Sequence, residues 1–130
     1  MEIFNSFGRK KEEFTPLVPA QVSIYVCGMT VYDLCHIGHA RVLVFFDVVR
    51  RWFESNGLKV TYVRNITDID DKIIARASKE GISVKELTTK YINEMRKDAS
   101  DLDVRSPSYE PLATDYIDEM IKLIDSLVEK

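Results

Sequence analysis

Histidine and cysteine are scarce in this sequence of 130 residues, and its net charge is small. The chain has two histidines, two cysteines and a formal net charge of only -3. It therefore lacks the overall positive charge with which many nucleic-acid-binding domains attract RNA or DNA. If RNA is a partner, it must be contacted by local patches or by parts of a protein outside these residues.

The two cysteines, Cys27 and Cys35, lie eight positions apart. This spacing suits neither a disulfide framework nor a CxxC redox pair. On composition alone, both are expected to be free, buried thiols, and for Cys35 we keep this packing role.

Long apolar runs are absent as well. No run approaches the roughly 20 residues that a transmembrane helix needs, and the opening MEIF does not resemble a signal peptide. We therefore expect a cytoplasmic protein with no membrane partner. With 45% hydrophobic and 30% charged residues, the composition is typical of one soluble globular unit.

Apolar periodicity predicts a strand, a helix and a second strand in the first half of the chain. Residues 21–26 (QVSIYV) are apolar and rich in β-branched residues, which is typical of a strand. From about Ile37, apolar residues recur at steps of three and four until Asn56-Gly57, a common helix stop. Residues 58–63 alternate between apolar and polar, which predicts the second strand. Together they indicate a βαβ unit with parallel strands.

The second half is predicted to be helical. Asp70 or Asp71 can cap a helix that ends near Gly81, and residues 83–86 (SVKE) form a capping box for a third helix. Residues 106–111, with two prolines, predict a loop.

A last helix, from about Thr114, reaches Lys130 without a stop signal, so we expect a truncated chain. The predicted fold is α/β, with a βαβ unit over about 20–75 and a helical segment over about 76–130.

Both histidines lie after the first strand, where the first helix is predicted to open, in HIGH at residues 36–39. In an open parallel sheet, ligands bind beyond the carboxyl ends of the strands, where helix N-termini favour phosphate. His36 and His39 can donate hydrogen bonds to phosphate oxygens, and Gly38 lets a phosphate or a flat base approach the backbone. The residues alone therefore predict a nucleotide phosphate site.

Two other interpretations of the histidine pair stay open at this stage. His36 and His39 could bind a metal ion, although they supply only two ligands and no third histidine exists. They could also be structural histidines at a helix start, and a four-residue pattern is only moderately specific.

The surrounding residues carry a clearer resemblance. The HIGH stretch is similar to the signature of class I aminoacyl-tRNA synthetases. Two longer blocks resemble the cysteinyl-tRNA synthetase family: YVCGMTVYD at residues 25–33 and YVRNITDIDDK at residues 62–72. The likeness extends to the pairs Phe4-Asn5, Glu110-Pro111 and Ala113-Thr114, and so covers nearly the whole chain.

The resemblance implies the N-terminal part of a Rossmann-like catalytic domain of the HIGH superfamily, with residues 76–130 leading into its connective insertion. It implies a ligase that joins cysteine to ATP, which enters with Mg²⁺, and releases pyrophosphate. The cysteinyl-adenylate then passes its cysteinyl group to tRNA(Cys). The intact enzyme is expected to be a monomer.

The same resemblance assigns roles to the residues of the ATP site. His36 and His39 would be the catalytic pair that holds the ATP phosphates and stabilises the transition state. Thr30 would line the ATP pocket, and Gly38 would lie under the adenine.

The resemblance also places a zinc ligand at Cys27, where the metal would bind the thiolate of substrate cysteine. Zinc binds thiolates well, whereas serine would offer a harder and less acidic oxygen. Gly28 and Thr67 would lie beside the same substrate. From the residues alone, Thr67 could instead cap a helix. The nearby acidic residues are as readily capping or surface charges as ligands: Asp68, Asp70 and Asp71.

One ligand does not make a zinc site, because a tetrahedral site needs three protein ligands when the substrate supplies the fourth. The family's other ligands lie downstream, and its second ATP signature, KMSKS, is absent from the 130 residues. We therefore expect this chain to be about the first third of the enzyme and inactive alone.

Two alternative functions remain at this stage. One is the related ligase that joins cysteine to glucosaminylinositol in mycothiol synthesis, which shares the adenylate chemistry. The other is a non-catalytic half-domain that binds nucleotides, which predicts a stable monomer with measurable ATP affinity.

Overall fold

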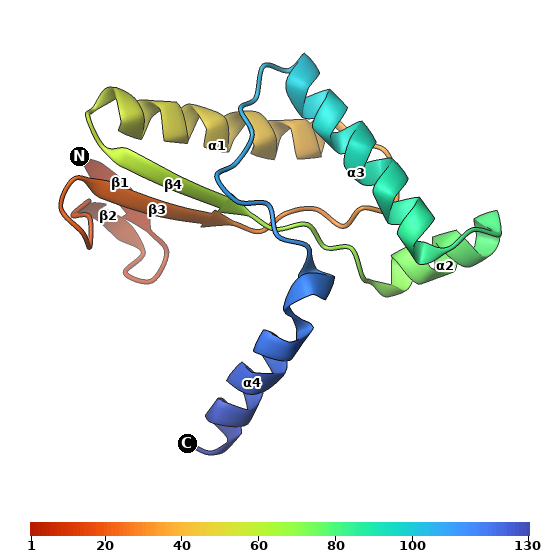
Figure 1. Ribbon diagram of the computed structural model, residues 1–130. Coiled ribbons are helices and arrows are strands. Elements are labelled where there is room, and N and C mark those ends of the chain that lie inside the picture. The colour runs from red at the N-terminus through yellow and green to blue at the C-terminus, as the bar shows by residue number, and fades with distance from the viewer.

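The structure is a computed structural model that describes residues 1–130. Its centre is a parallel strand pair, β3 (Gln21–Val26) and β4 (Lys59–Arg64), connected by the long helix α1 (Ile37–Ser55). Figure 1 shows that α1 covers one face of this pair. The predicted α/β class and βαβ unit are confirmed, although β4 begins and ends one residue later than predicted.

A third segment lies parallel to β4 on its other edge. Val63 forms a parallel bridge with Tyr109, and Ile66 forms one with Leu112. The Ile66 N–H donates to the Pro111 carbonyl oxygen at 2.8 Å. The prediction of a plain loop over residues 106–111 was therefore incomplete, because prolines are tolerated at the edge of a sheet.

The connection from β4 to this third segment is helical. It contains α2 (Asp71–Glu80) and α3 (Val84–Asp101), which pack against each other beside the strand ends. Asp70 caps α2 and a Ser83–Glu86 capping box opens α3, as predicted. Their apolar faces form the main core with residues from the loops after β3 and β4: Val31, Ile66, Ile73, Ala77, Leu87, Tyr91, Ile92 and Met95.

Both ends of the chain extend from this core. The N-terminal hairpin of β1 (Glu2–Asn5) and β2 (Lys10–Glu13) was not predicted, because its residues are mostly polar and none is buried. At the other end, a short 3₁₀ turn, η1 (Ala113–Tyr116), leads into α4 (Ile117–Val128). The last helix was therefore predicted correctly, but its first turn is 3₁₀. No helix is long and apolar enough to cross a bilayer.

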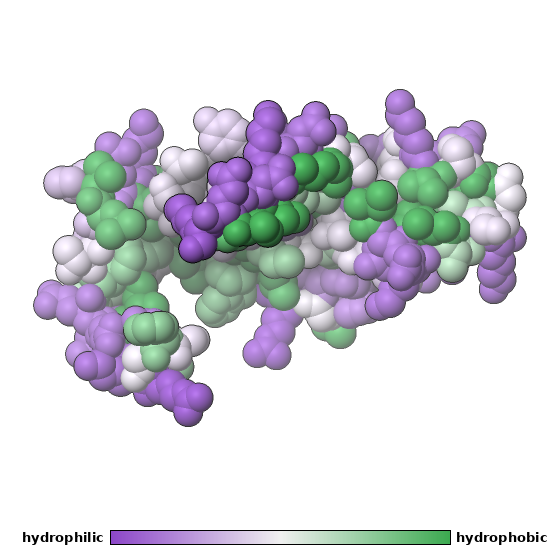
Figure 2. Space-filling view, turned by 90° about the horizontal axis from the view of Figure 1, so that it is seen from below, coloured by the Kyte–Doolittle hydropathy of each residue, from purple (hydrophilic) through white to green (hydrophobic).

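Helix α4 projects from the side of the strands opposite α1, and none of its residues is buried. Figure 2, seen from that side, shows hydrophobic residues lying between hydrophilic ones on the surface. An apolar groove of about 580 Å³ lies between α4 and the uncovered strand face, lined by residues that include Tyr25, Val63, Tyr109, Leu112, Tyr116 and Met120.

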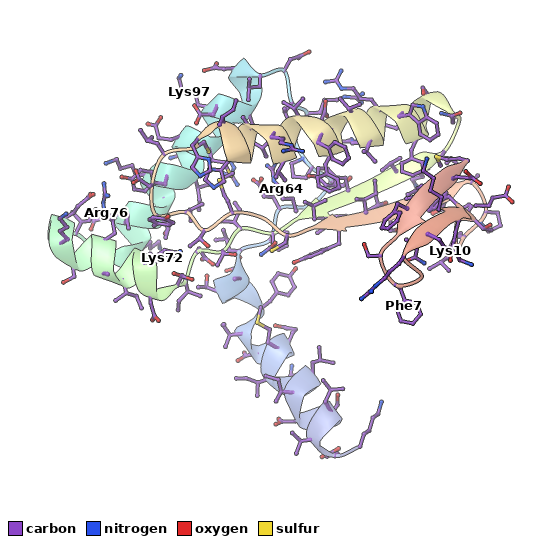
Figure 3. All side chains as sticks on the ribbon, turned by 180° about the vertical axis from the view of Figure 1, so that it is seen from behind. Phe7, Lys10, Arg64, Lys72, Arg76 and Lys97 are labelled. Carbon is purple, nitrogen blue, oxygen red and sulfur yellow. The ribbon has the colours of Figure 1, made fainter.

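A buried ion pair joins β4 to the third segment. Arg64, the last residue of β4, lies inside the molecule, near α1 in Figure 3. Its Nη2 donates to Glu110 Oε1 at 2.6 Å, and Arg96 Nε from α3 donates to Glu110 Oε2 at 2.9 Å. The side chains of Arg64 and Glu110 are only 5% and 13% exposed. Glu110 thus connects β4 with α3.

We expect Glu110→Ala to lower the free energy of unfolding by about 3–5 kcal/mol, because it leaves the buried Arg64 guanidinium without a partner. The matched control is Asp101→Ala, which breaks the exposed pair of Lys97 and Asp101, 3.0 Å apart. That change should cost about 0.3–0.5 kcal/mol. Urea unfolding measures both, and equal effects would contradict the role of Glu110.

Candidate functional site

The two histidines cap the N-terminus of α1 as a reciprocal pair. His36 is the N-cap residue, and its Nδ1 accepts a hydrogen bond of 3.0 Å from the Gly38 N–H. His39 reaches back, and its Nδ1 accepts one of 3.2 Å from the His36 N–H. The rings are stacked, with centroids 3.9 Å apart. This is a capping box in which histidines replace the usual Ser or Thr and Glu or Gln.

The capping bonds determine where the protons of the two rings lie. Because each Nδ1 accepts a hydrogen bond, the proton of a neutral ring is on Nε2. Burial, followed by the neighbouring charge of His36, lowers the pKa of His39 below its ordinary value. At neutral pH, His39 is therefore an uncharged ring with an Nε2–H donor that the cap does not use.

Gly38 also leaves room for the cap. A Cβ atom at this position would lie 2.8 Å from Cε1 of the His36 ring. The absence of a side chain therefore makes room for His36, in addition to any ligand that approaches the backbone.

The residues after β3 and β4 lie side by side. Thr30 and Thr67 form a parallel bridge, and the Thr67 N–H donates to the Met29 carbonyl oxygen at 3.1 Å. Gly28 lies still closer to the segment that follows β4, since a Cβ at this position would lie 1.6 Å from the backbone oxygen of Asn65. Only glycine fits at this crossing, and the structure thereby brings Gly28, Thr30 and Thr67 to one edge.

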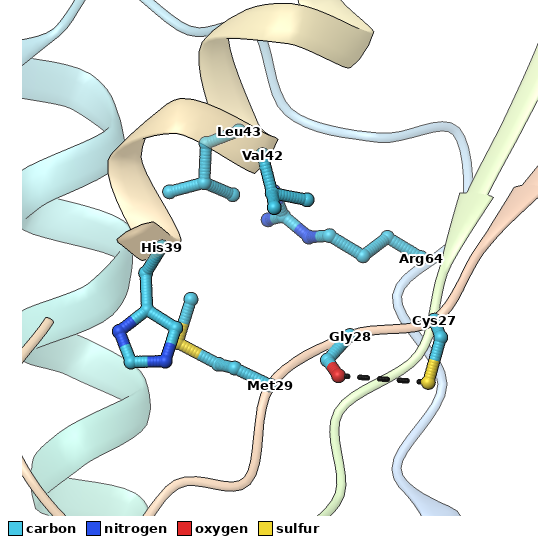
Figure 4. Close-up of a pocket in the computed structure, with 7 residues that line it drawn as sticks. All are labelled: Cys27, Gly28, Met29, His39, Val42, Leu43 and Arg64. Carbon is cyan, nitrogen blue, oxygen red and sulfur yellow. Dashed lines mark hydrogen bonds between the residues drawn. The ribbon is translucent and has the colours of Figure 1, made fainter. Parts of the chain in front are cut away.

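A cavity of about 220 Å³ joins this edge to the start of α1. Figure 4 shows His39 on one side and Cys27 with Gly28 on the other. The lining also includes Met29, Val42, Leu43 and Arg64. Three of the residues predicted from the sequence therefore face one space, although they come from different elements. Four other predicted residues are not part of this lining but lie near it in the chain or in the strand pairing: Thr30, His36, Gly38 and Thr67.

The two cysteines differ in their surroundings. Cys27 is exposed, and its Sγ lies 3.7 Å from the Gly28 carbonyl oxygen, a weak contact. The expectation of a buried thiol was therefore wrong for Cys27, because the residue follows the strand end instead of belonging to the core. Cys35 is half-buried and packs against the main core, as predicted. Burial, and then the charge of Asp98, raises the pKa of Cys35 to about 11.

No group of three His, Cys, Asp or Glu side chains in residues 1–130 is arranged to hold a metal ion. Cys27 fits one position of a thiolate-containing site, because its sulfur is exposed at a cavity and no strong hydrogen bond restrains it. His36 and His39 use their Nδ1 atoms as acceptors in the cap, and a neutral ring then carries its proton on Nε2. Neither ring nitrogen therefore offers a free lone pair to a metal ion at these two residues.

The acidic residues after β4 have structural roles. Asp68 is only 7% exposed, and its Oδ1 accepts a hydrogen bond of 3.0 Å from the Thr114 N–H. The interpretation of Asp68 as a surface charge was thus wrong. Asp70, and not Thr67, caps α2 by accepting a bond of 2.8 Å from the Lys72 N–H.

Two residues beside the cavity were not predicted as parts of the site. Arg64 lines the cavity, and Asn65 accepts a hydrogen bond from Gly28. Both lie in the YVRNITDIDDK block. Their position directly after a predicted strand was the signal that could have identified them.

Comparison with known proteins points to one family. A family model described as the class I (C) tRNA synthetase catalytic domain matches residues 13–130. A cysteine–tRNA ligase from Methylobacillus flagellatus is 58% identical over 130 residues, which are 100% of this chain and 29% of the relative. One from Herminiimonas arsenicoxydans is 55% identical over 127 residues, 98% of this chain and 28% of the relative. The chain thus spans less than a third of the length of these curated relatives.

We expect a thiol-specific alkylating reagent at pH 8 to modify Cys27 quickly and Cys35 slowly. Cys27 is exposed, whereas a thiol with a pKa of about 11 is ionised in only about one molecule in a thousand at that pH. Cys27→Ser should remove the fast phase and Cys35→Ser should keep it. Equal rates for the two thiols would contradict this assignment.

Proposed function

The chain belongs to the family of class I (C) tRNA synthetase catalytic domains, and on this premise we propose that it forms part of the active site of a cysteine–tRNA ligase. The full-length protein would activate cysteine with ATP and Mg²⁺, release pyrophosphate and transfer the cysteinyl group to tRNA(Cys). We further propose that it does so as a monomer in the cytoplasm. The α/β unit would be the first part of a Rossmann-like domain.

One observation carries this proposal: the cavity has a histidine at a helix N-terminus on one side and a free thiol on the other. His39 supplies an Nε2–H donor at the N-terminus of α1, where the helix dipole favours anions. Cys27 supplies the thiol at the end of β3. An enzyme that activates cysteine with ATP needs these two features next to each other.

The histidines suit phosphate chemistry because they are held rigidly. The reciprocal cap fixes the direction of both rings, so that their Nε2–H groups need little reorganisation as negative charge develops on the phosphates. His36 and His39 would act as donors in adenylate formation. Thr30 and Gly38, on either side of this region, would complete the ATP site.

The thiol side would select the amino acid. Cys27 would be one ligand of a zinc ion whose other ligands lie outside these residues, and the metal would supply a soft Lewis acid for the substrate thiol. Gly28 and Thr67 would contact the substrate from the two neighbouring strand ends, which the Thr30–Thr67 bridge keeps together. Serine would be rejected because its hydroxyl is a poorer ligand.

We expect His39→Ala in the full-length protein to lower the rate of cysteine-dependent ATP–pyrophosphate exchange roughly 100-fold or more, with a much smaller change in ATP binding. This variant also loses the capping acceptor, so its stability should fall.

The matched variant is His39→Glu, since glutamate is a usual partner at this position of a capping box. It should restore the thermal stability but not the exchange. Recovery of exchange together with stability would contradict the catalytic role, because capping alone would then explain the loss.

We expect Cys27→Ser to lower the zinc content of the full-length protein and to raise the KM for cysteine, because the hydroxyl of serine is a poor zinc ligand. Cys35→Ser is the control, since Cys35 packs on the core and lies outside the cavity. Metal analysis after dialysis measures the zinc content. Retention of zinc and of the cysteine KM in Cys27→Ser would contradict the ligand role.

A further inference from the structure

The pairing of the two parallel strands changes register immediately after they end. The regular ladder finishes at the pair Val26 and Arg64, and the next bridge joins Thr30 to Thr67. The three residues 27–29 therefore lie opposite the two residues 65–66. The regular ladder is therefore interrupted between these two bridges, with one more residue on the β3 side than on the β4 side.

The side chain of Asn65 bridges this interruption of the ladder. Its Oδ1 accepts a hydrogen bond of 2.7 Å from the Gly28 N–H. Its Nδ2 lies on the other side, 3.5 Å from Thr67 Oγ1. One amide thus connects the two strand ends at the residues that flank the thiol side of the cavity.

Cys27 has little support of its own. Its Sγ makes only the weak contact with the Gly28 carbonyl oxygen, so the direction of the thiol follows the backbone at residues 27–28. The Asn65–Gly28 hydrogen bond holds that backbone. The histidine side is independent of Asn65, because His36 and His39 are fixed by their own capping bonds.

We propose that Asn65 is a positioning residue for amino-acid binding: its amide oxygen holds Gly28, and with it the neighbouring Cys27, in the arrangement that receives the substrate cysteine. This inference rests on the proposed function. It predicts that loss of the Asn65 amide raises the KM for cysteine without a comparable rise in the KM for ATP. A general loss of stability would not produce this difference.

The test compares Asn65→Ala, Asn65→Asp and Asn56→Ala in the full-length protein, by cysteine-dependent ATP–pyrophosphate exchange and by thermal unfolding. Asn56 is the matched control, because its Nδ2 donates a bond of 2.7 Å to the Trp52 carbonyl oxygen at the opposite end of α1. Each alanine variant therefore removes one hydrogen bond between an asparagine and the backbone.

We expect Asn65→Ala to raise the KM for cysteine about tenfold, since the Gly28 N–H loses its acceptor, and to leave the KM for ATP within about twofold. Asn65→Asp keeps an acceptor for Gly28 and should recover most of the cysteine KM. Asn56→Ala should lower the Tm without changing either KM. If Asn65→Ala does not fold, Asn65→Ser replaces it in the test. Its hydroxyl is too short to replace the amide, so we expect the same rise in the KM for cysteine.

A cysteine KM that is unchanged in Asn65→Ala, or that rises equally with the ATP KM, would overturn the positioning role and leave the proposed function intact. An Asn65→Asp protein as defective as Asn65→Ala would also overturn it, because the acceptor for Gly28 would then not matter. A parent protein without any cysteine-dependent exchange would overturn the proposed function, and this inference with it.

Discussion

The parallel pairing of β3 with β4 is the constraint on which the candidate site depends. Because both strands run in the same direction, the residues that follow them leave the sheet at one edge, and the helix between them begins beside that edge. The pairing continues beyond the strands and brings Thr30 beside Thr67, 37 positions further along the chain. The buried pair of Arg64 and Glu110 then secures β4 against the segment on its other side.

The two sides of the cavity are held in different ways. The histidine side is local, since His36 and His39 form a capping box within four residues of one helix. The thiol side depends on contacts between distant residues, such as the hydrogen bond of 2.7 Å from Gly28 to Asn65. A local change can therefore disturb the histidine pair without moving the thiol side.

Sequence patterns were sufficient for the features that depend on near neighbours. Apolar periodicity predicted β3, α1 and the later helices, and capping residues such as Asp70 and Ser83 placed their first turns correctly. The interruption of the ladder after the strands could not be predicted, because it arises from pairing with residues 65–67. The role of Asp68 was missed for the same reason, since its partner Thr114 is 46 positions away. The resemblance to a family located the site residues, but periodicity did not show how they are held.

In the proposed function, one cavity combines a helix start that would bind phosphate with a strand end that would select the thiol. ATP–pyrophosphate exchange by the full-length protein, measured with cysteine and with serine as the amino acid, probes both sides at once. We expect exchange with cysteine and about 10⁴-fold less efficient exchange with serine, as for a site that requires a specific polar contact. No exchange with cysteine, or equal exchange with both amino acids, would contradict it.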